Sequence, residues 1–389
     1  MILRNLRLVG EDERTRSLIL DGALITAVDE GTDLPANSPR VLELGGALAF
    51  PGLVNSHDHL EFNLFRPTGH GPYVDYLAWA ADVQQRHRRE FERVLQVPPA
   101  LRRRWGVLKN LLAGVTTVVH HGDPVSEPHP LDVYGQCLCL HSVAFEKRWR
   151  FQLNFVRHPH RVAIHAGEGI GAACHREIDR LLRWNLTRRP LIAIHGVAMS
   201  PSQAARFKAL VWCPDSNRFL LGRSADVGEL KRQTAILFGT DATLSADWNL
   251  WNHLRLAREL GGLEDGELFE ALTVAAAGVW GLGSSGKLKA GATADLVVAK
   301  GKPELSGWDA FFALEPQDLL LVLKRGMPVL LDAALQPEFE KRVGRTPGLH
   351  PLVHGDRVKY VAEDLASLVA ETKKFLPDFF PPYHVRTSS

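Results

Sequence analysis

Four apolar runs in the middle of the chain each end in side chains that can bind a metal ion. These side chains, with the runs that precede them, are His57 and His59 after 53–56, His165 after 162–164, His195 after 191–194, and Asp241 after 235–240. Short apolar runs of this kind are typical of buried strands. In a parallel barrel all strands point the same way, and the active site lies at their C-terminal ends. We therefore expect these side chains to converge at one end of a barrel.

The spacing of His57 and His59 suits a shared ion. Residues i and i+2 of a strand face the same side, so both imidazoles can reach one cation while Asp58 points away. Imidazole and carboxylate ligands suit Zn²⁺ or Fe²⁺, and three or four protein ligands leave a position open for water. Such an ion lowers the pKa of bound water from about 15.7 to about 7, which would supply hydroxide at neutral pH.

Each of these residues also has an ordinary structural interpretation when it is taken singly. A strand-end histidine is often only hydrogen-bonded, and Asp241 could cap a helix. The joint occurrence of four such ends favours a shared metal site. His120 and His121 end a further apolar run, and a pocket role and a structural role fit them equally well.

Glu168 follows His165 by three residues and would overhang the predicted metal site. A carboxylate there is suited to shuttle protons during hydrolysis at a ring carbon. The alternative is a carboxylate that interacts with a helix N-terminus. Further side chains near the motif ends fit core packing and a pocket wall equally well: Trp79, Ser216, Asn217 and Trp248. Surface roles are expected for several histidines in predicted loops and helices: His70, His129, His158, His160 and His175.

The elements that must position the central side chains alternate along the chain. Helical stretches are predicted at 98–112, 173–186, 200–210 and 250–260. Their alternation with apolar runs indicates a parallel sheet with crossover helices, of a length that fits a β/α barrel. Between His121 and Val162 one strand, 134–143, is evident and a second is not, so we expect a distorted barrel there.

Short strands at both chain ends flank this middle region. They are predicted at 2–9, 17–20, 24–28 and 41–44, and again at 294–299, 319–323 and 327–331. We expect one small β-sandwich built from both ends. The predicted domains are therefore 1–52 and 283–335 for the sandwich, 53–282 for the barrel, and 336–389 for a helix and an extended tail, with helical periodicity at 358–375.

Composition excludes several classes of protein. Among the 389 residues 45% are hydrophobic and 23% are charged, which is typical of a globular chain. The net charge is +2 and no basic stripe is interleaved with aromatic residues, which argues against nucleic-acid binding. Four cysteines form no disulfide framework in a chain this long, and neither a signal peptide nor a membrane span is evident. We expect a cytoplasmic protein.

Six stretches together resemble a known family. They are PGLVNSHDHL at 51–60, GVTTV at 114–118, HAGE at 165–168, CPDSN at 213–217, GTD at 239–241 and GKLKAGATADLV at 286–297. The chain resembles the amidohydrolase superfamily, and most closely the aminohydrolase/chlorohydrolase branch that includes cytosine, guanine and S-adenosylhomocysteine deaminases and triazine hydrolases. The fold class implied is α/β: a distorted (β/α)8 metal-dependent hydrolase barrel with a small β-sandwich domain.

The resemblance also implies a ligand set. One divalent ion, Zn²⁺ or alternatively Fe²⁺, would be held by His57, His59, His165 and Asp241, with His195 beside the metal-bound water or the substrate. Binuclear relatives bridge two ions with a carboxylated lysine. Here Lys147 is the only lysine between His121 and His165, and its charged neighbours indicate a surface residue. A mononuclear site is therefore expected.

The implied reaction is hydrolytic deamination, or dechlorination, of an amino-substituted N-heterocycle by metal-bound hydroxide. Asp241 would take the proton of the water, Glu168 would protonate a ring nitrogen and then the leaving group, and His195 would stabilise the oxyanion or orient the water. A cyclic-amide hydrolase of the imidazolonepropionase or dihydroorotase type shares these ligands and stays an alternative. A catalytically silent scaffold of the same fold is a further alternative. The expected partner is a small-molecule substrate of open identity, and a homodimer is compatible with the resemblance.

Overall fold

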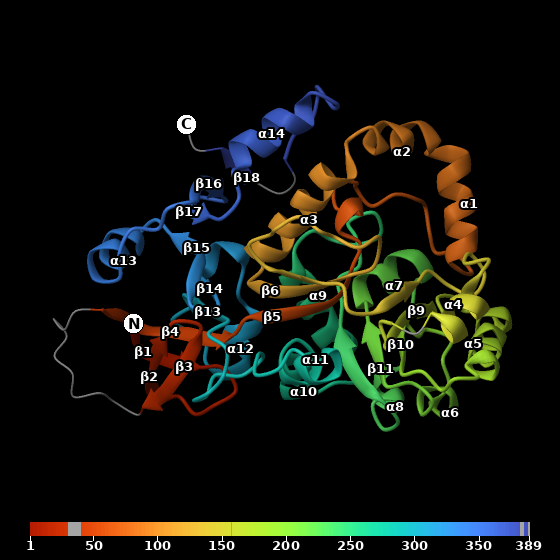
Figure 1. The fold of residues 1–389 in the computed structure, drawn as a ribbon, viewed down its shortest axis with the longest axis horizontal. Coiled ribbons are helices and arrows are strands. Elements are labelled where there is room, and N and C mark those ends of the chain that lie inside the picture. Colours follow the sequence, from red (N-terminus) through yellow and green to blue (C-terminus); the bar gives the residue numbers. More distant parts are fainter. Residues whose placement is uncertain (30–39, 157, 382–384, 388–389) are drawn as a thin grey trace.

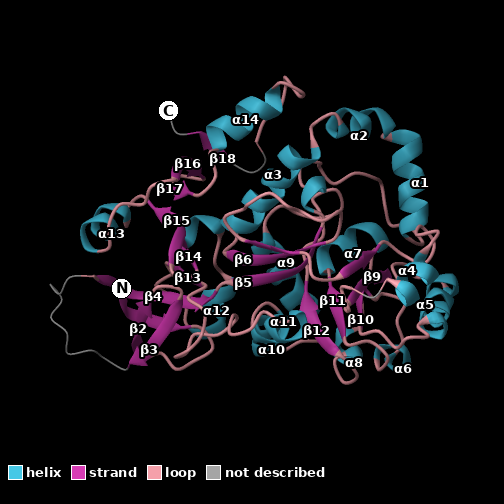
Figure 2. Ribbon diagram, viewed as in Figure 1, coloured by secondary structure: helices cyan, strands magenta, loops and turns pink. Residues whose placement is uncertain are grey.

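Eight parallel strands lie at the centre of the computed structural model, which describes residues 1–29, 40–156, 158–381 and 385–387 (Figures 1 and 2). Five form a sheet in the order β12 (Ala235–Phe238), β11 (Ala209–Trp212), β10 (Leu191–His195), β9 (Val162–Ala166) and β8 (Leu138–Leu140). Three form a second sheet in the order β5 (Leu53–Asp58), β6 (Val115–His120) and β7 (Asp132–Tyr134). All pairs within these sheets are parallel.

Backbone hydrogen bonds join the two sheets on one side. The N–H groups of Thr240 and Asp241, directly after β12, donate to the carbonyl oxygen of His57 on β5 at 3.1 Å. The ends of the strands that carry predicted ligands are thus tied together by the main chain. This arrangement is the predicted barrel.

The opposite side of the barrel is distorted, as the sequence indicated. Only residues 135–137 separate β7 from β8, so no crossover helix lies between them. β7 pairs with β6, whereas β8 pairs with β9. One bent segment, 132–140, therefore takes the places of two barrel strands, which explains why the sequence shows only one strand there.

Most helices pack around the barrel or over its C-terminal end, and the last two along the chain contact strands of the sheet formed by the chain ends (Figure 1). They are α1 (Tyr76–Arg86), α2 (Arg88–Leu95), α3 (Pro99–Leu112), α4 (Trp149–Phe155), α5 (Ala172–Trp184), α6 (Pro201–Ala204), α7 (Pro214–Leu221), α8 (Val227–Leu230), α9 (Leu250–Leu260), α10 (Asp265–Ala271), α11 (Val274–Trp280), α12 (Gly307–Phe312), α13 (Gln336–Arg342) and α14 (Leu365–Lys373), with 3-10 turns η1 (Leu60–Phe62) and η2 (Pro316–Asp318). Predicted helices over 98–112, 173–186 and 250–260 correspond to α3, α5 and α9. The prediction for 200–210 is wrong beyond Ala204, because residues 209–212 are needed as β11 between β10 and β12.

Strands from both chain ends form one ten-stranded sheet beside the barrel (Figure 2). Its order is β18 (Val385–Thr387), β16 (His350–His354), β17 (Arg357–Val361), β15 (Met327–Asp332), β14 (Leu319–Lys324), β13 (Leu296–Ala299), β4 (Val41–Pro51), β1 (Ile2–Leu8), β2 (Thr15–Asp21) and β3 (Leu24–Asp29). The two ends of the chain meet where β4 pairs with β13. The predicted helix 358–375 is confirmed over α14 but its start is strand β17, and β16, β17 and β18 extend this sheet where no strand was expected. Part of the predicted tail, 382–384 and 388–389, lies outside the described residues.

A tightly buried apolar core supports the barrel strands whose ends carry the predicted ligands. Apolar side chains such as Val54, Ile192, Ile194 and Leu237 fill the barrel interior and are essentially fully buried. Each such side chain stabilises the fold by roughly 1.5–3 kcal/mol relative to exposure. None of the helices in the described ranges is long and apolar enough to cross a membrane.

Candidate metal centre

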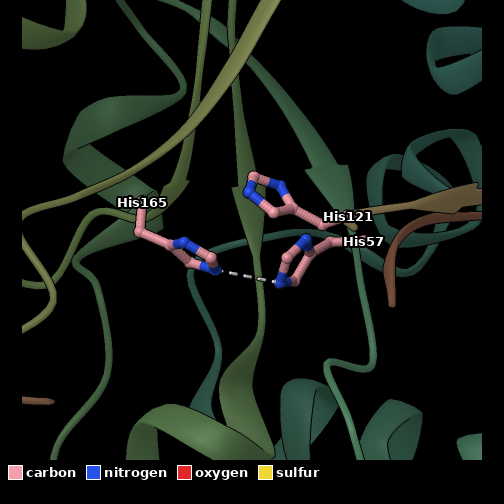
Figure 3. A group of neighbouring side chains, drawn as sticks. All are labelled: His57, His121 and His165. Atoms are coloured by element: carbon pink, nitrogen blue, oxygen red, sulfur yellow. Dashed lines mark hydrogen bonds between the residues drawn. The ribbon is translucent and has the colours of Figure 1, made fainter. Parts of the chain in front are cut away.

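The predicted metal ligands meet at the C-terminal ends of the barrel strands. The Nε2 atom of His165 lies 3.3 Å from Nε2 of His57 and 3.4 Å from Nε2 of His59. The Oδ1 atom of Asp241 lies 3.5 Å from Nε2 of His57 and 3.8 Å from Nε2 of His59. Figure 3 shows His57 and His165 pointing toward one another. Four donor atoms from three separate strand ends therefore surround one point.

The spacing of these atoms fits a tetrahedral cation site. Zinc binds imidazole nitrogen and carboxylate oxygen at about 2.0–2.2 Å, which places neighbouring tetrahedral ligands about 3.4 Å apart. Four of these separations, those of His165 and of Asp241 from His57 and His59, are 3.3–3.8 Å and match that spacing. His121 also presents a nitrogen within 4.8 Å of nitrogens of His57 and His165. Three imidazoles and one carboxylate also form a donor set typical of Zn²⁺ or Fe²⁺. The residues present fit a divalent metal ion.

Hydrogen bonding and burial keep the imidazoles ready to bind a cation. The Nδ1 atom of His165 lies 2.6 Å from the carbonyl oxygen of His141, so Nδ1–H donates there and the lone pair stays on Nε2. Burial lowers the pKa of His57 to about 4 and holds the pKa of His165 well below its ordinary value. Both rings are therefore neutral near pH 7, as ligand imidazoles must be.

The carboxylate of Asp241 is held ionised and oriented. Burial by itself raises its pKa, but the interaction with His57, and then with His195 and His59, holds the pKa well below its usual range, because these imidazoles become charged at the low pH where the carboxylate would be protonated. Its Oδ2 accepts hydrogen bonds from Ser216 Oγ at 2.7 Å and from Ser245 Oγ at 3.1 Å, which leaves Oδ1 facing the histidines. Asp241 also has a φ of +56°, and His195 has a φ of +73°, so both strand ends hold strained backbone.

Glu168 and His195 lie beside this ligand cluster. The Nε2 atom of His195 lies 3.6 Å from Oε1 of Glu168 and 3.9 Å from Oδ2 of Asp241. The Nδ1 atom of His195 donates to Oδ1 of Asn217 at 2.8 Å, so the Nε2 lone pair faces the site. Burial, and then the charge of Asp241, raises the pKa of Glu168 well above its ordinary value. The raised pKa of Glu168 favours its protonated form, and this group lies next to the imidazole of His195 and the carboxylate of Asp241.

The structure separates the two alternatives for His120 and His121. His121 lines the cavity, and its ring centroid lies 4.6 Å from that of His165 (Figure 3). Its Nε2 contacts the carbonyl oxygen of Leu140 at 3.1 Å. His120 points the other way, toward Glu61, with Nε2 3.3 Å from the carboxylate. His121 is thus a pocket residue and His120 a structural one.

Lys109 and Asp58 form a buried ion pair behind the ligands that was not predicted from the sequence. Lys109 on α3 lies 3.0 Å from Oδ2 of Asp58, and both side chains are buried. The ammonium also donates to the backbone oxygen of Asp241 at 3.1 Å. Lys109 therefore links β5 to the end of β12. The available signal was a lysine within the apolar stretch 105–112 of a predicted helix.

A cavity of about 860 Å³ opens above the cluster. His59, His165, Glu168, His195 and Asp241 line its base. Aromatic side chains contribute to its wall, namely Phe62, Tyr76, Trp79, Phe91 and Phe145. Trp79 is thus a wall residue, whereas Trp248 is buried elsewhere and Lys147 is exposed to solvent.

Comparison with known proteins agrees with this geometry. Residues 158–329 match the model of the Amidohydrolase family. The chain has the amidohydrolase fold. The match over residues 158–329 agrees with the resemblance recognised in the sequence, and the described side chains include groups that could hold a metal ion. None of the curated proteins matches the chain significantly in sequence.

Solved structures with a similar fold align with most of this chain. Atrazine chlorohydrolase TrzN from Arthrobacter aurescens, complexed with zinc, is 18% identical with a TM-score of 0.67, over 97% of this chain and 100% of that one. An adenosine deaminase from Xanthomonas campestris with bound zinc is 18% identical with a TM-score of 0.65, over 97% of both chains. N-isopropylammelide isopropylaminohydrolase from Burkholderia multivorans is 16% identical with a TM-score of 0.61, over 84% and 97%. The TM-scores of 0.61–0.67 show a shared fold, at identities of 16–18%.

Proposed function

We propose that this amidohydrolase removes an amino group, or a chlorine, from an amino-substituted N-heterocycle by hydrolysis. The observation that carries the proposal is the buried acid Glu168, which stands between the ligand cluster and the cavity with a pKa raised by burial. Attack of water on a heteroaromatic ring requires an acid that can protonate the ring and the leaving group. Similar solved structures named as a chlorohydrolase and a deaminase support the same reaction class.

His57, His59, His165 and Asp241 are the proposed metal ligands, and their shared donor spacing supports this assignment. A bound divalent ion supplies Lewis acidity and lowers the pKa of water. The ligands must be deprotonated to bind it, which the buried, neutral imidazoles satisfy. Zn²⁺ is the proposed ion because this donor set suits it and two of the similar structures contain zinc.

The proton steps follow from the charge states of three residues. Contacts with His57 and the other histidines keep the pKa of Asp241 low, so Asp241 is ionised and has a lone pair that can accept a proton from the attacking water. Protonated Glu168 donates its proton to a ring nitrogen, takes up the proton of the added hydroxyl group, and passes it to the leaving amino group. Transfer of the proton held by Asp241 to Glu168 then restores both groups. His195 presents Nε2 to the same space, and Asn217 fixes its orientation. Each acid–base group of this kind contributes about 10²–10⁴-fold to the rate.

The cavity wall suits a flat heteroaromatic ring. Phe62 and Phe91 pack with their ring centroids 6.4 Å apart, and the Trp79 indole N–H is satisfied by the carbonyl oxygen of Thr68 at 2.7 Å. Aromatic faces of this kind stack on planar rings. The volume of about 860 Å³ lies within the usual range of small-molecule sites.

The test is a release assay on zinc-loaded protein with purines, pyrimidines, pterins and triazines as substrates. We expect ammonia or chloride release from at least one class, and Glu168→Gln should lower that rate at least about 10²-fold. Glu259→Gln is the matched control, because Glu259 is exposed on α9 and is not among the residues that line the cavity. Mass spectrometry that shows addition of water with ring opening, and no loss of a substituent, would instead establish the cyclic-amide alternative. Full zinc loading without any turnover of these classes would refute the proposal.

A further inference from the structure

A second group of metal-binding side chains lies outside the centre, where α1 meets α2. One nitrogen each of His70 and His87 and a carboxylate oxygen of Asp82 lie within 4.8 Å of one another. Asp82 lies on α1, His87 lies between α1 and α2, and His70 lies on the loop that precedes them. Residues from three separate positions of the chain therefore present donors to one point near the surface.

The imidazole rings of His70 and His87 are stacked in the same way as two imidazole rings of the metal centre. The rings of His70 and His87 are stacked with centroids 5.3 Å apart and planes at 23°. The rings of His59 and His165 are stacked with centroids 5.4 Å apart and planes at 12°. In addition, Nε2 of His87 is buried and has no hydrogen-bond partner among the described residues. A buried imidazole nitrogen without a partner is costly unless something else occupies it.

Neighbouring side chains fix the orientation of the Asp82 carboxylate, as is usual for carboxylates that bind metal ions. Its Oδ2 accepts from the hydroxyl of Tyr73 at 2.6 Å, and its Oδ1 pairs with Nε of Arg86 at 2.9 Å. Each carboxylate oxygen keeps a further lone pair for a cation. The Tyr73 hydroxyl also accepts from the backbone N–H of His70 at 2.6 Å, so it ties the loop to α1. Outer contacts of this kind orient the ligands of metal sites.

We propose that His70, Asp82 and His87 bind one zinc-like transition-metal ion, separate from the ion of the metal centre. Two imidazoles and one carboxylate with an open position suit Zn²⁺ and disfavour Mg²⁺ or Ca²⁺, which take oxygen ligands. The ion joins the loop that carries His70 to the junction of α1 and α2 at His87. Because α1 and α2 line the cavity through Trp79, Val83 and Phe91, the ion fixes this wall.

The test counts zinc bound to the full-length chain. Protein stripped with a chelator is dialysed against Zn²⁺, and bound zinc is measured by mass spectrometry. We expect two ions per wild-type chain and one in His70→Ala/His87→Ala. His175→Ala is the matched control, because His175 faces Asp179 at 4.0 Å without a third ligand, and it should retain two ions. A wild-type chain with one ion, or a double variant with two, would overturn the proposal.

A second variant keeps all three proposed ligands and so keeps the fold of the site. Tyr73→Phe removes the hydroxyl that orients Asp82 and the His70 backbone. We expect two ions at saturation. In a chelator competition, the affinity of the His70/Asp82/His87 site for zinc should fall about 10–100-fold. An affinity equal to that of the wild type would contradict the site as described.

Discussion

Replacement of Lys109 by Met should destabilise the barrel at the ends that carry the candidate ligands. The Lys109 ammonium lies 3.0 Å from the carboxylate of Asp58, and both groups are buried. Removal of one partner of a buried pair costs about 3–5 kcal/mol, because the other charge is left buried. Three amide donors stay on Asp58, from Asn63 at 2.6 Å, Asn110 at 2.7 Å and Asn55 at 3.3 Å, which places the expected loss near 3 kcal/mol.

That loss corresponds to a change of roughly 10²-fold in the unfolding equilibrium, measurable by urea titration of metal-free protein. Asp58→Asn in the Lys109→Met background removes the orphaned charge and should recover more than half of the loss. Lys208→Met replaces an exposed lysine and should change stability by less than about 0.5 kcal/mol. A loss below about 1 kcal/mol in Lys109→Met, or no recovery in the double variant, would refute the reasoning.

Activity should fall as the pH rises through the raised pKa of Glu168, because only the protonated acid can donate; a rate–pH profile that rises there would contradict this role. Asn217→Ala removes the acceptor that orients His195 and should lower kcat about 10–100-fold with zinc content unchanged. Ser216→Ala removes a hydrogen bond to Asp241 and should lower zinc affinity about 10–100-fold in chelator competition, a result to be compared with Ser202→Ala at the surface. Gly52→Ala would bring a Cβ to 2.3 Å from Thr116 and should cost about 1–3 kcal/mol in urea unfolding.

Much of the barrel was predictable because its signals are local. Strand-end polar residues after apolar runs predicted His57, His165 and Asp241 at one rim, and the structure brings their donor atoms together. The i, i+2 spacing likewise placed His59 with His57 and turned Asp58 away toward Lys109. Helices α3 and α9 follow their predicted ranges because each has an apolar period and ends near a glycine.

Other features depended on contacts between distant segments. The short helix α6 ends early because residues 209–212 pair with β10 and β12, a demand that no local pattern expresses. The segment 132–140 serves two strands because its two halves pair with β6 and β9. The strands after residue 349 join the sheet because β17 pairs with β15 in antiparallel orientation.

The sequence by itself determined the kinds of ligand, their order along the chain and the class of barrel that presents them, because periodicity and strand-end chemistry are local properties. Tertiary structure alone decided that His121 faces the cavity while His120 faces Glu61, and that Asn217 orients His195. It also decided the charge states of Glu168 and Asp241, since burial and neighbouring charges act through space. These are properties of distances between residues far apart in the chain, which no spacing within one segment specifies.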